Sequence, residues 1–181
     1  MRLRLRLLRV ILSALFRRKN FYFDDYSALH FTVMPSDCVL KYVGNDRYHA
    51  FMDLGRIDLL IRSGGWNTLL FEKLQPFVFT AHIRYCHPLQ IFRRVTLYTR
   101  LIHWDNSSFW IEHIFKSEGT TIATAISKNG FIHRNKIVPT EYIFNLLNGE
   151  KIPSPYSVKK IPVLAAIEKL LRELRKEPKM S

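Results

Sequence analysis

Carboxylates gather around the start of one predicted helix. Asp37 lies in a short polar loop that leads into a helical pattern beginning near Asn45, and Asp46 stands in the first turn of that helix. Backbone N–H groups at a helix N-terminus stabilise negative charge. A carboxylate in this loop could therefore face a carbonyl carbon that those amides polarise. Asp37 could equally be a turn residue, and Asp46 an ordinary charge at a helix start.

The other reactive residue types are scattered. Asp53 and Arg56 have the i,i+3 spacing of a structural ion pair, and Asp53 is a secondary site candidate. Cys86 and His87 are neighbours on a predicted strand and would point to opposite faces. The seven histidines and two cysteines show no zinc-ligand spacing. Neither a nucleophilic-serine motif nor a phosphate-binding glycine loop occurs, so we expect no metal and no cofactor.

The net charge of +13 belongs to the two ends of the chain. Residues 1–23 contain seven basic and no acidic side chains, and residues 151–181 contain eight basic and three acidic ones, which gives +7 and +5. Residues 24–150 contain 13 basic and 12 acidic side chains. A nearly neutral body argues against nucleic-acid binding. We expect one globular domain over residues 24–150, flanked by two cationic segments.

Residues 2–17 form an amphipathic pattern on a helix, with arginines on one side and large apolar residues on the other. The polar stripe consists of Arg2, Arg6, Arg9, Ser13 and Arg17. This pattern favours a helix lying on an anionic membrane surface. Packing on the protein's own body or on a partner subunit, and nucleic-acid binding, are the alternatives. A second basic helix is expected at residues 162–176, after a proline-containing linker.

Cysteine content and hydropathy bear on the compartment. Two cysteines do not make a disulfide framework, so a reducing environment is expected. No apolar run reaches the roughly 18 to 20 residues of a membrane-spanning helix, and the apolar stretch at residues 7–16 lacks a signal-peptide cleavage site. These features predict a cytoplasmic protein, and the amphipathic pattern of residues 2–17 would hold it at the inner membrane surface.

Hydrophobic periodicity divides the body into a strand, a long helix and a meander of strands. The helix is expected to begin after Asn45 as its N-cap. The expected strands lie at 29–33, 77–85, 94–104, 109–116 and 120–127, with a continuation at 131–133, and the expected helices at 46–63, 66–74 and 139–147. This order predicts an α+β fold in which an antiparallel sheet wraps one long helix.

The order of elements and several local sequences resemble the hot-dog fold over about residues 29–147. The carrying segments are Pro35-Ser36-Asp37, Asn45-Asp46-Arg47-Tyr48, Met52-Asp53-Leu54-Gly55-Arg56, Ile83-Arg84-Tyr85 with Pro88-Leu89, and Leu101-Ile102-His103-Trp104-Asp105. They are similar to acyl-CoA thioesterases of the 4-hydroxybenzoyl-CoA-thioesterase-like branch and to thioesterase superfamily member 6-like proteins. The resemblance implies a homodimer with active sites at the subunit interface.

The resemblance also implies a reaction and its residues. Such enzymes hydrolyse acyl-CoA or acyl-carrier-protein thioesters with a carboxylate, while amides at the start of the central helix stabilise the oxyanion. Asp37 matches the first of two family aspartates, so Asp37, Asn45 and Asp46 are the catalytic candidates. The substrate-binding candidates are Tyr48, Arg47 and Arg84.

One departure from the family pattern bears on activity. Val39 stands where the second aspartate, usually the catalytic one, belongs. A valine can neither transfer a proton nor act as a nucleophile. Two functions therefore stay open: a thioesterase near a membrane surface in which Asp37 substitutes, or a degenerate hot-dog protein that binds acyl thioesters or lipid without hydrolysis.

Overall fold

The computed structural model describes residues 6–12, 25–148, 166–167 and 169. The strands are β1 (Ser27–Thr32), β2 (Cys38–Val39), β3 (Tyr42–Val43), β4 (Gln75–Tyr85), β5 (Arg94–Trp104), β6 (Phe109–Ser117), β7 (Thr120–His133) and β8 (Lys136–Val138). The helices are the short η1 (Pro35–Asp37), α2 (Asn45–Arg62), α3 (Gly65–Phe71) and α4 (Thr140–Asn148), and residues 6–12 are also helical.

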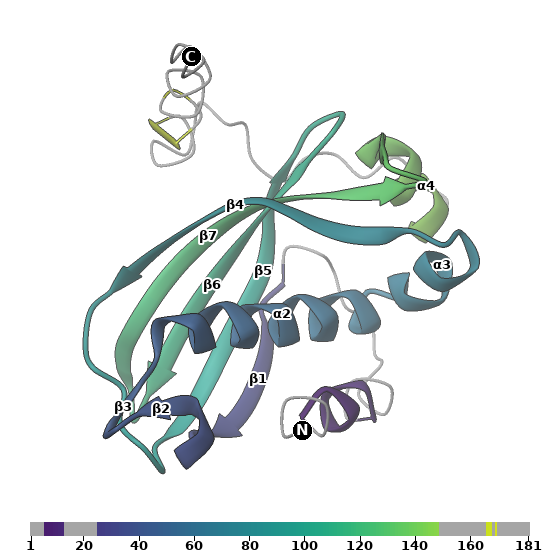
Figure 1. The fold of residues 1–181 in the computed structure, drawn as a ribbon. Coiled ribbons are helices and arrows are strands. Elements are labelled where there is room, and N and C mark those ends of the chain that lie inside the picture. The colour runs from purple at the N-terminus through teal and green to yellow at the C-terminus, as the bar shows by residue number, and fades with distance from the viewer. Residues whose placement is uncertain (1–5, 13–24, 149–165, 168, 170–181) are drawn as a thin grey trace, which may run out of the picture.

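A six-stranded antiparallel sheet curls around α2 (Figure 1). Its main path runs β1-β5-β6-β7-β4, and β8 pairs with the end of β7. β2 and β3 form a separate small hairpin between β1 and α2 in the chain. The α+β architecture expected from the sequence, with one long helix inside a curled antiparallel sheet, is confirmed.

The core lies between α2 and the concave face of the sheet. Phe51 and Met52 of α2 are fully buried, as are Leu97 of β5 and Phe115 of β6. A Cβ atom on Gly55 would lie only 2.5 Å from Oγ1 of Thr99 and 3.0 Å from Cδ2 of Leu97, so a larger residue there would displace these side chains of β5. The close approach of α2 to β5 therefore depends on glycine at this position.

Most element boundaries follow the sequence, and the exceptions have local causes. The helix start is one: Gly44 is the N-cap of α2, and Asn45, expected there, is its first helical residue. α3 ends at Phe71 rather than at Leu74, because Lys73 adopts a left-handed conformation with φ of 52°. β7 runs unbroken through Asn129 where an interruption was expected, and β8 was not predicted at all.

The predicted hairpin between β5 and β6 is confirmed. Asp105 Oδ1 accepts hydrogen bonds from the backbone N–H groups of Ser107 and Ser108, each at 2.9 Å. These bonds lower the pKa of the Asp105 carboxyl against the opposing effect of its burial, the largest influence on it. The aspartate therefore folds the turn rather than acting on a ligand.

The N-terminal helix differs from expectation in the part the structure describes. Arg6, placed by the sequence on the polar stripe, turns toward the body, where its guanidinium lies 5.5 Å from the centre of the Phe51 ring. Val10 is buried beside it, while Leu8 and Leu12 are about half exposed, at 54% and 49%. In this segment an arginine thus faces the body while two leucines face solvent, which differs from the predicted sorting of arginines to one side and apolar residues to the other.

The remaining predictions for the chain ends fall largely outside the described residues. Of the basic helix expected at residues 162–176, three residues are described, at 166, 167 and 169, and all three are helical. Ile167 is buried in a small cluster with Ile102 and Trp110. Most of the segments at 1–23 and 151–181, including the proline-containing linker, therefore stay predictions.

Candidate active site

The loop before α2 holds Asp37 in a fixed position. Asp37 is buried, with 6% of its surface exposed. Its Oδ2 accepts a hydrogen bond from Arg6 Nη2 at 2.7 Å and another from the backbone N–H of Met34 at 2.8 Å. Its backbone carbonyl accepts from the N–H of Gly44 at 3.1 Å. This carboxylate therefore joins the N-terminal segment, the loop and the start of α2.

The first turn of α2 is more open. The Asp46 side chain is 71% exposed, and its Oδ2 lies 3.2 Å from Nε of Arg47. Among the described residues, no side-chain hydrogen bond caps this helix terminus. The helix dipole would favour an anion or a developing oxyanion here. Val39, at the usual position of the second family aspartate, is 70% exposed nearby in the chain.

Of the substrate-binding candidates, Tyr48 is buried in the core and Arg84 is exposed on β4. Tyr48 is buried and makes edge-on contacts with Tyr85 and Phe115, with ring centres 5.0 and 5.2 Å apart. Burial, with smaller contributions from Tyr85 and Cys38, raises the pKa of Tyr48 to about 12, so the phenol stays neutral. Arg84 is exposed on β4.

The register of β4 separates Arg84 from the start of α2. Ile83 packs on the core cluster that contains residues of α2, and neighbouring side chains on a strand point to opposite faces. Arg84 therefore points away from the helix. The structure brings Asp37, Asn45, Asp46, Arg47 and Tyr48 together around the first turn of α2, and it leaves Arg84 apart.

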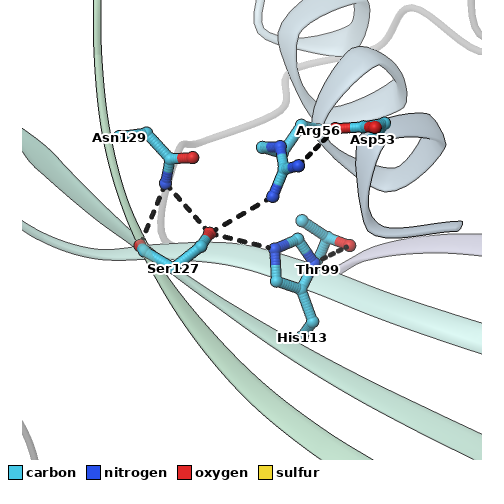
Figure 2. Close-up of polar contacts among 6 residues, drawn as sticks. All are labelled: Asp53, Arg56, Thr99, His113, Ser127 and Asn129. Carbon is cyan, nitrogen blue, oxygen red and sulfur yellow. Dashed lines mark hydrogen bonds and ion pairs between the residues drawn. The ribbon is translucent and has the colours of Figure 1, made fainter. Parts of the chain in front are cut away.

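A second polar cluster lies beneath the middle of α2 (Figure 2). Arg56 Nη2 pairs with Asp53 on the helix, and Nη1 donates to Ser127 Oγ at 3.4 Å. Ser127 Oγ also lies 3.3 Å from His113 Nε2, and Thr99 Oγ1 lies 3.3 Å from His113 Nδ1. Asn129 Nδ2 donates to Ser127 Oγ at 3.0 Å. One helix and three strands thus build a continuous hydrogen-bonded network.

His113 is neutral within this network. Complete burial, with a smaller contribution from the charge of Arg56, holds the pKa of His113 well below its usual range. Because Ser127 Oγ already accepts from Arg56 and Asn129, its own hydrogen satisfies His113 Nε2, and His113 Nδ1–H then points to Thr99. Each hydrogen bond in this arrangement has one donor and one acceptor.

An apolar cavity of about 350 Å³ adjoins the network. Asp53, Arg56 and Asn129 contribute its polar wall. The apolar wall consists of Ile57, Leu59, Leu60, Pro76, Phe77, Val78, Leu101, Phe109, Ile111 and Phe131. The Asp53 side chain is 62% exposed and that of Arg56 only 14%, so the carboxylate marks the solvent side. The volume lies within the range of small-molecule pockets.

Of this second cluster, the sequence indicated only Asp53 and Arg56, as an i,i+3 ion pair with Asp53 a secondary site candidate. The sequence did contain a signal for Thr99 and His113: each is a polar residue at a strand position where the alternation calls for an inward-facing apolar side chain. Thr99 stands between Leu97 and Leu101, and His113 between Ile111 and Phe115. In the register of the sheet, Thr99 pairs directly with His113, so the strand alignment decides that these interruptions meet.

Comparison with known proteins places the chain in a family. A model of the thioesterase-like superfamily matches residues 16–163, and the chain therefore belongs to that superfamily. It is also 25% identical over 129 residues to protein THEM6 of Drosophila melanogaster, across 70% of this chain and 67% of that protein.

Solved structures share the fold. A probable thioesterase from Bartonella henselae, 24% identical, aligns with a TM-score of 0.59 over 71% of this chain and all of its own. A 4-hydroxybenzoyl-CoA thioesterase variant complexed with 4-hydroxybenzoyl-CoA, 14% identical, aligns with a TM-score of 0.62 over 68% of this chain and 99% of its own. The hot-dog fold expected from the sequence is confirmed.

Two absences concern only the part of the chain that the structure describes. Among those residues no three histidine, cysteine, aspartate or glutamate side chains gather as a metal site would require. Within the same ranges, no helix combines the length and the hydropathy needed to cross a membrane.

Proposed function

We propose that this protein hydrolyses acyl thioesters at the mouth of the cavity beneath α2, with Asp53 as the general base. The observation that carries the proposal is a carboxylate at the solvent side of an apolar cavity, next to a guanidinium group. An acyl chain would occupy the apolar wall, which leaves its thioester carbon near Asp53. This is the chemistry expected of a thioesterase-like protein.

The reaction follows from these two side chains. Asp53 takes a proton from a water molecule while the water oxygen attacks the thioester carbon. Arg56 donates to the carbonyl oxygen as that oxygen becomes negative, and collapse of the tetrahedral intermediate expels the thiolate. The first-turn amides of α2 lie about 8 to 12 Å along the helix axis from Asp53, so they do not serve the same carbonyl within one subunit.

Asp37 remains the competing candidate from the sequence. It would need to leave its ion pair with Arg6, and then it would act with the amides of Asn45 and Asp46. Thiol release from acyl-CoA substrates decides between the carboxylates. Asp53→Asn should abolish most activity, while Asp37→Asn and Asp46→Asn should retain it; the reverse pattern would return catalysis to the first turn of α2.

The second candidate function is binding without hydrolysis. It is favoured by exposed Val39 at the usual place of the catalytic aspartate and by the engagement of Asp37 with Arg6. Calorimetry with acyl-CoA, in parallel with thiol release, separates the two functions. Binding without thiol release would identify an acyl-thioester-binding protein, and Val39→Asp would then test whether the missing carboxylate explains the loss.

A homodimer paired along β4 is part of the proposal. β4 is 11 residues long and pairs only with β7 among the described strands. Its aromatic side chains Phe77, Phe79 and Tyr85 are 47%, 40% and 45% exposed. A long apolar edge invites pairing, and a two-fold axis would cover both copies. Light scattering at micromolar concentration should give twice the 21.4 kDa chain mass, whereas a clean monomer would contradict this.

Attachment to an anionic membrane surface through the N-terminal segment is the last part of the proposal. Exposed Leu8 and Leu12 supply apolar contact, and the basic residues of the segment 1–23 other than Arg6, which is paired with Asp37, supply charge. Co-sedimentation with anionic vesicles should fall when residues 1–22 are removed, and it should weaken in high salt if charge dominates. Equal sedimentation of both proteins would assign the segment to packing on the body alone.

A further inference from the structure

One buried hydrogen-bond acceptor at the cavity is unused. Asn129 is 2% exposed and lines the cavity beneath α2. Its Oδ1 atom has no hydrogen-bond partner among the described residues. Leaving such an acceptor unpaired in a buried site is costly, comparable to the loss of a hydrogen bond or more. A ligand group that donates a hydrogen bond to Asn129 Oδ1 would therefore be favoured at this position.

Rotation of the amide does not relieve this. Asn129 Nδ2 donates to the Ser127 carbonyl at 2.9 Å and to Ser127 Oγ at 3.0 Å. A reversed amide would place Oδ1 against that carbonyl oxygen, two acceptors facing each other. Figure 2 shows Oδ1 pointing away from Ser127, on the side of Arg56. The hydrogen bonds of Asn129 Nδ2 to Ser127 thus fix the amide so that Oδ1 points away from Ser127.

Arg56 supplies hydrogen-bond donors at the same wall of the cavity. Its guanidinium carries donors only, and the pair with Asp53 and the bond to Ser127 hold it in place. A ligand group placed between Arg56 and Asn129 would therefore meet a donor on one side and an acceptor on the other. An unsubstituted acyl chain offers neither partner, whereas a hydroxyl group offers both.

We propose that the cavity selects acyl chains that carry a hydroxyl group close to the thioester carbon, with Asn129 Oδ1 accepting the hydroxyl hydrogen and Arg56 donating to the hydroxyl oxygen. The inference rests on the proposed function, because it places an acyl chain in this cavity. It adds a substrate class and names Asn129 as the residue that determines specificity.

The size of the preference follows from the unpaired acceptor. Asn129 Oδ1 is buried without a donor in the free protein, so a plain chain leaves it unpaired, whereas a hydroxylated chain gives it a hydrogen bond. Sites built to hydrogen-bond a substrate hydroxyl discriminate strongly against the analogue that lacks it. For one neutral hydrogen bond we expect binding on the order of tenfold tighter for the hydroxylated chain.

The test measures binding apart from catalysis. Calorimetry with the full-length protein compares non-hydrolysable CoA thioethers of equal chain length, one plain and two with a hydroxyl on the second or third chain carbon. Wild type should bind at least one hydroxylated ligand on the order of tenfold more tightly than the plain one. Equal affinity for all three ligands would overturn the inference.

Two variants locate the effect. Asn129→Leu should lose the preference and bind the plain chain at least as well as wild type, because no acceptor is left unpaired. Thr99→Val is the matched control: it removes the contact of Thr99 Oγ1 with His113 Nδ1, a bond of the same network that involves neither Asn129 nor Arg56, so the preference should survive. A preference that persists in Asn129→Leu would overturn the role of Asn129. If that variant does not fold, the wild-type ligand comparison still decides.

Failure of the inference is distinguishable from failure of the proposed hydrolysis. Thiol release from the matching thioesters is measured separately. Hydroxyl preference without thiol release would keep the binding inference and overturn hydrolysis. Thiol release at equal rates, with equal affinities for plain and hydroxylated chains, would keep hydrolysis and overturn the inference.

Discussion

The two halves of α2 use their polar residues in opposite ways. Around its first turn, Asp37 is engaged by Arg6 and Met34, and Tyr48 is part of the aromatic core. Beneath its middle, Asp53 stays exposed beside a cavity, and Asn129 keeps an acceptor unused. The loop and first-turn residues that the sequence favoured for catalysis are largely structural, while a secondary candidate, Asp53, forms the more open site with residues distant in the chain.

This difference shows which kind of site a sequence motif can reveal. A motif specifies residues that lie close in the chain, and the loop before α2 is such a stretch. The cluster beneath α2 draws on positions from Asp53 to Asn129, contributed by the four elements α2, β5, β6 and β7. If the open cluster beneath α2 carries the function, changes at Asp53 affect activity most; if the first turn carries it, changes at Asp37 do.

The largest expected effect is on turnover. Asp53→Asn should lower thiol release from acyl-CoA by about 10² to 10⁴, the usual cost of losing a general base. Asp37→Asn should lower it less than about tenfold, because the Asp37 carboxylate is buried as well as bound by Arg6, whereas that of Asp53 stays open to solvent beside Arg56. Circular dichroism verifies that both variants are folded. Full activity in Asp53→Asn would contradict the proposed role of Asp53 and would point to the first turn of α2 as the catalytic site.

The second prediction separates functional from structural charge on α2. Asp58 is fully buried, Arg62 Nε lies 2.9 Å from its Oδ2, and Ser27 donates to the same oxygen. Asp58→Asn should lower the free energy of unfolding by about 3–5 kcal/mol, because it leaves the nearly buried Arg62 without its counter-charge.

The control for this prediction is the exposed carboxylate Asp46. Asp46→Asn should change the free energy of unfolding by less than about 0.5 kcal/mol. Urea unfolding of the two variants measures both values. A small effect of Asp58→Asn would mean that the buried ion pair adds little to the hold of α2 on β1.

The third prediction concerns the attachment of the N-terminal segment. Asp37→Asn should weaken the contact with Arg6 and destabilise the protein by about 1–3 kcal/mol. Hydrogen exchange should rise in residues 6–12 and in the loop before α2, and little elsewhere. Arg6→Gln should reproduce this exchange pattern. Unchanged protection in both variants would show that Val10 and the apolar contacts suffice.

The smallest expected effect is on acid stability. The pKa of His113 lies well below its usual value of 6.5 in the folded protein, so below pH 6.5 the unfolded chain binds a proton that the folded protein does not. Stability contributed by neutral His113 is therefore complete above this pH and falls as the pH decreases, by at most about 1.4 kcal/mol per pH unit.

Replacement of this histidine supplies the comparison. His113→Gln keeps a polar side chain without the titration, and its stability should fall less steeply than that of wild type between pH 6.5 and 5. Urea unfolding across this range gives the two slopes. Parallel slopes would show that other groups dominate acid unfolding.

The sequence by itself determined the architecture and most element boundaries. Alternation of Leu97, Thr99 and Leu101 predicts a strand, and the apolar positions of α2 predict a long helix, because both signals depend on neighbours within a few residues. The family and its hot-dog fold were likewise readable from local segments such as Asn45 to Tyr48. Homodimer formation and membrane attachment stay predictions.

Only the tertiary structure decided which polar residues meet. Nothing in the local sequence states that Arg6 reaches Asp37, or that Thr99, His113 and Ser127 share one network under Arg56. Those encounters depend on strand register and on the close approach that Gly55 permits between α2 and β5. Hydrogen bonds act over about 3 Å, so a shift of one residue in register would turn these side chains to the other face and dissolve the site.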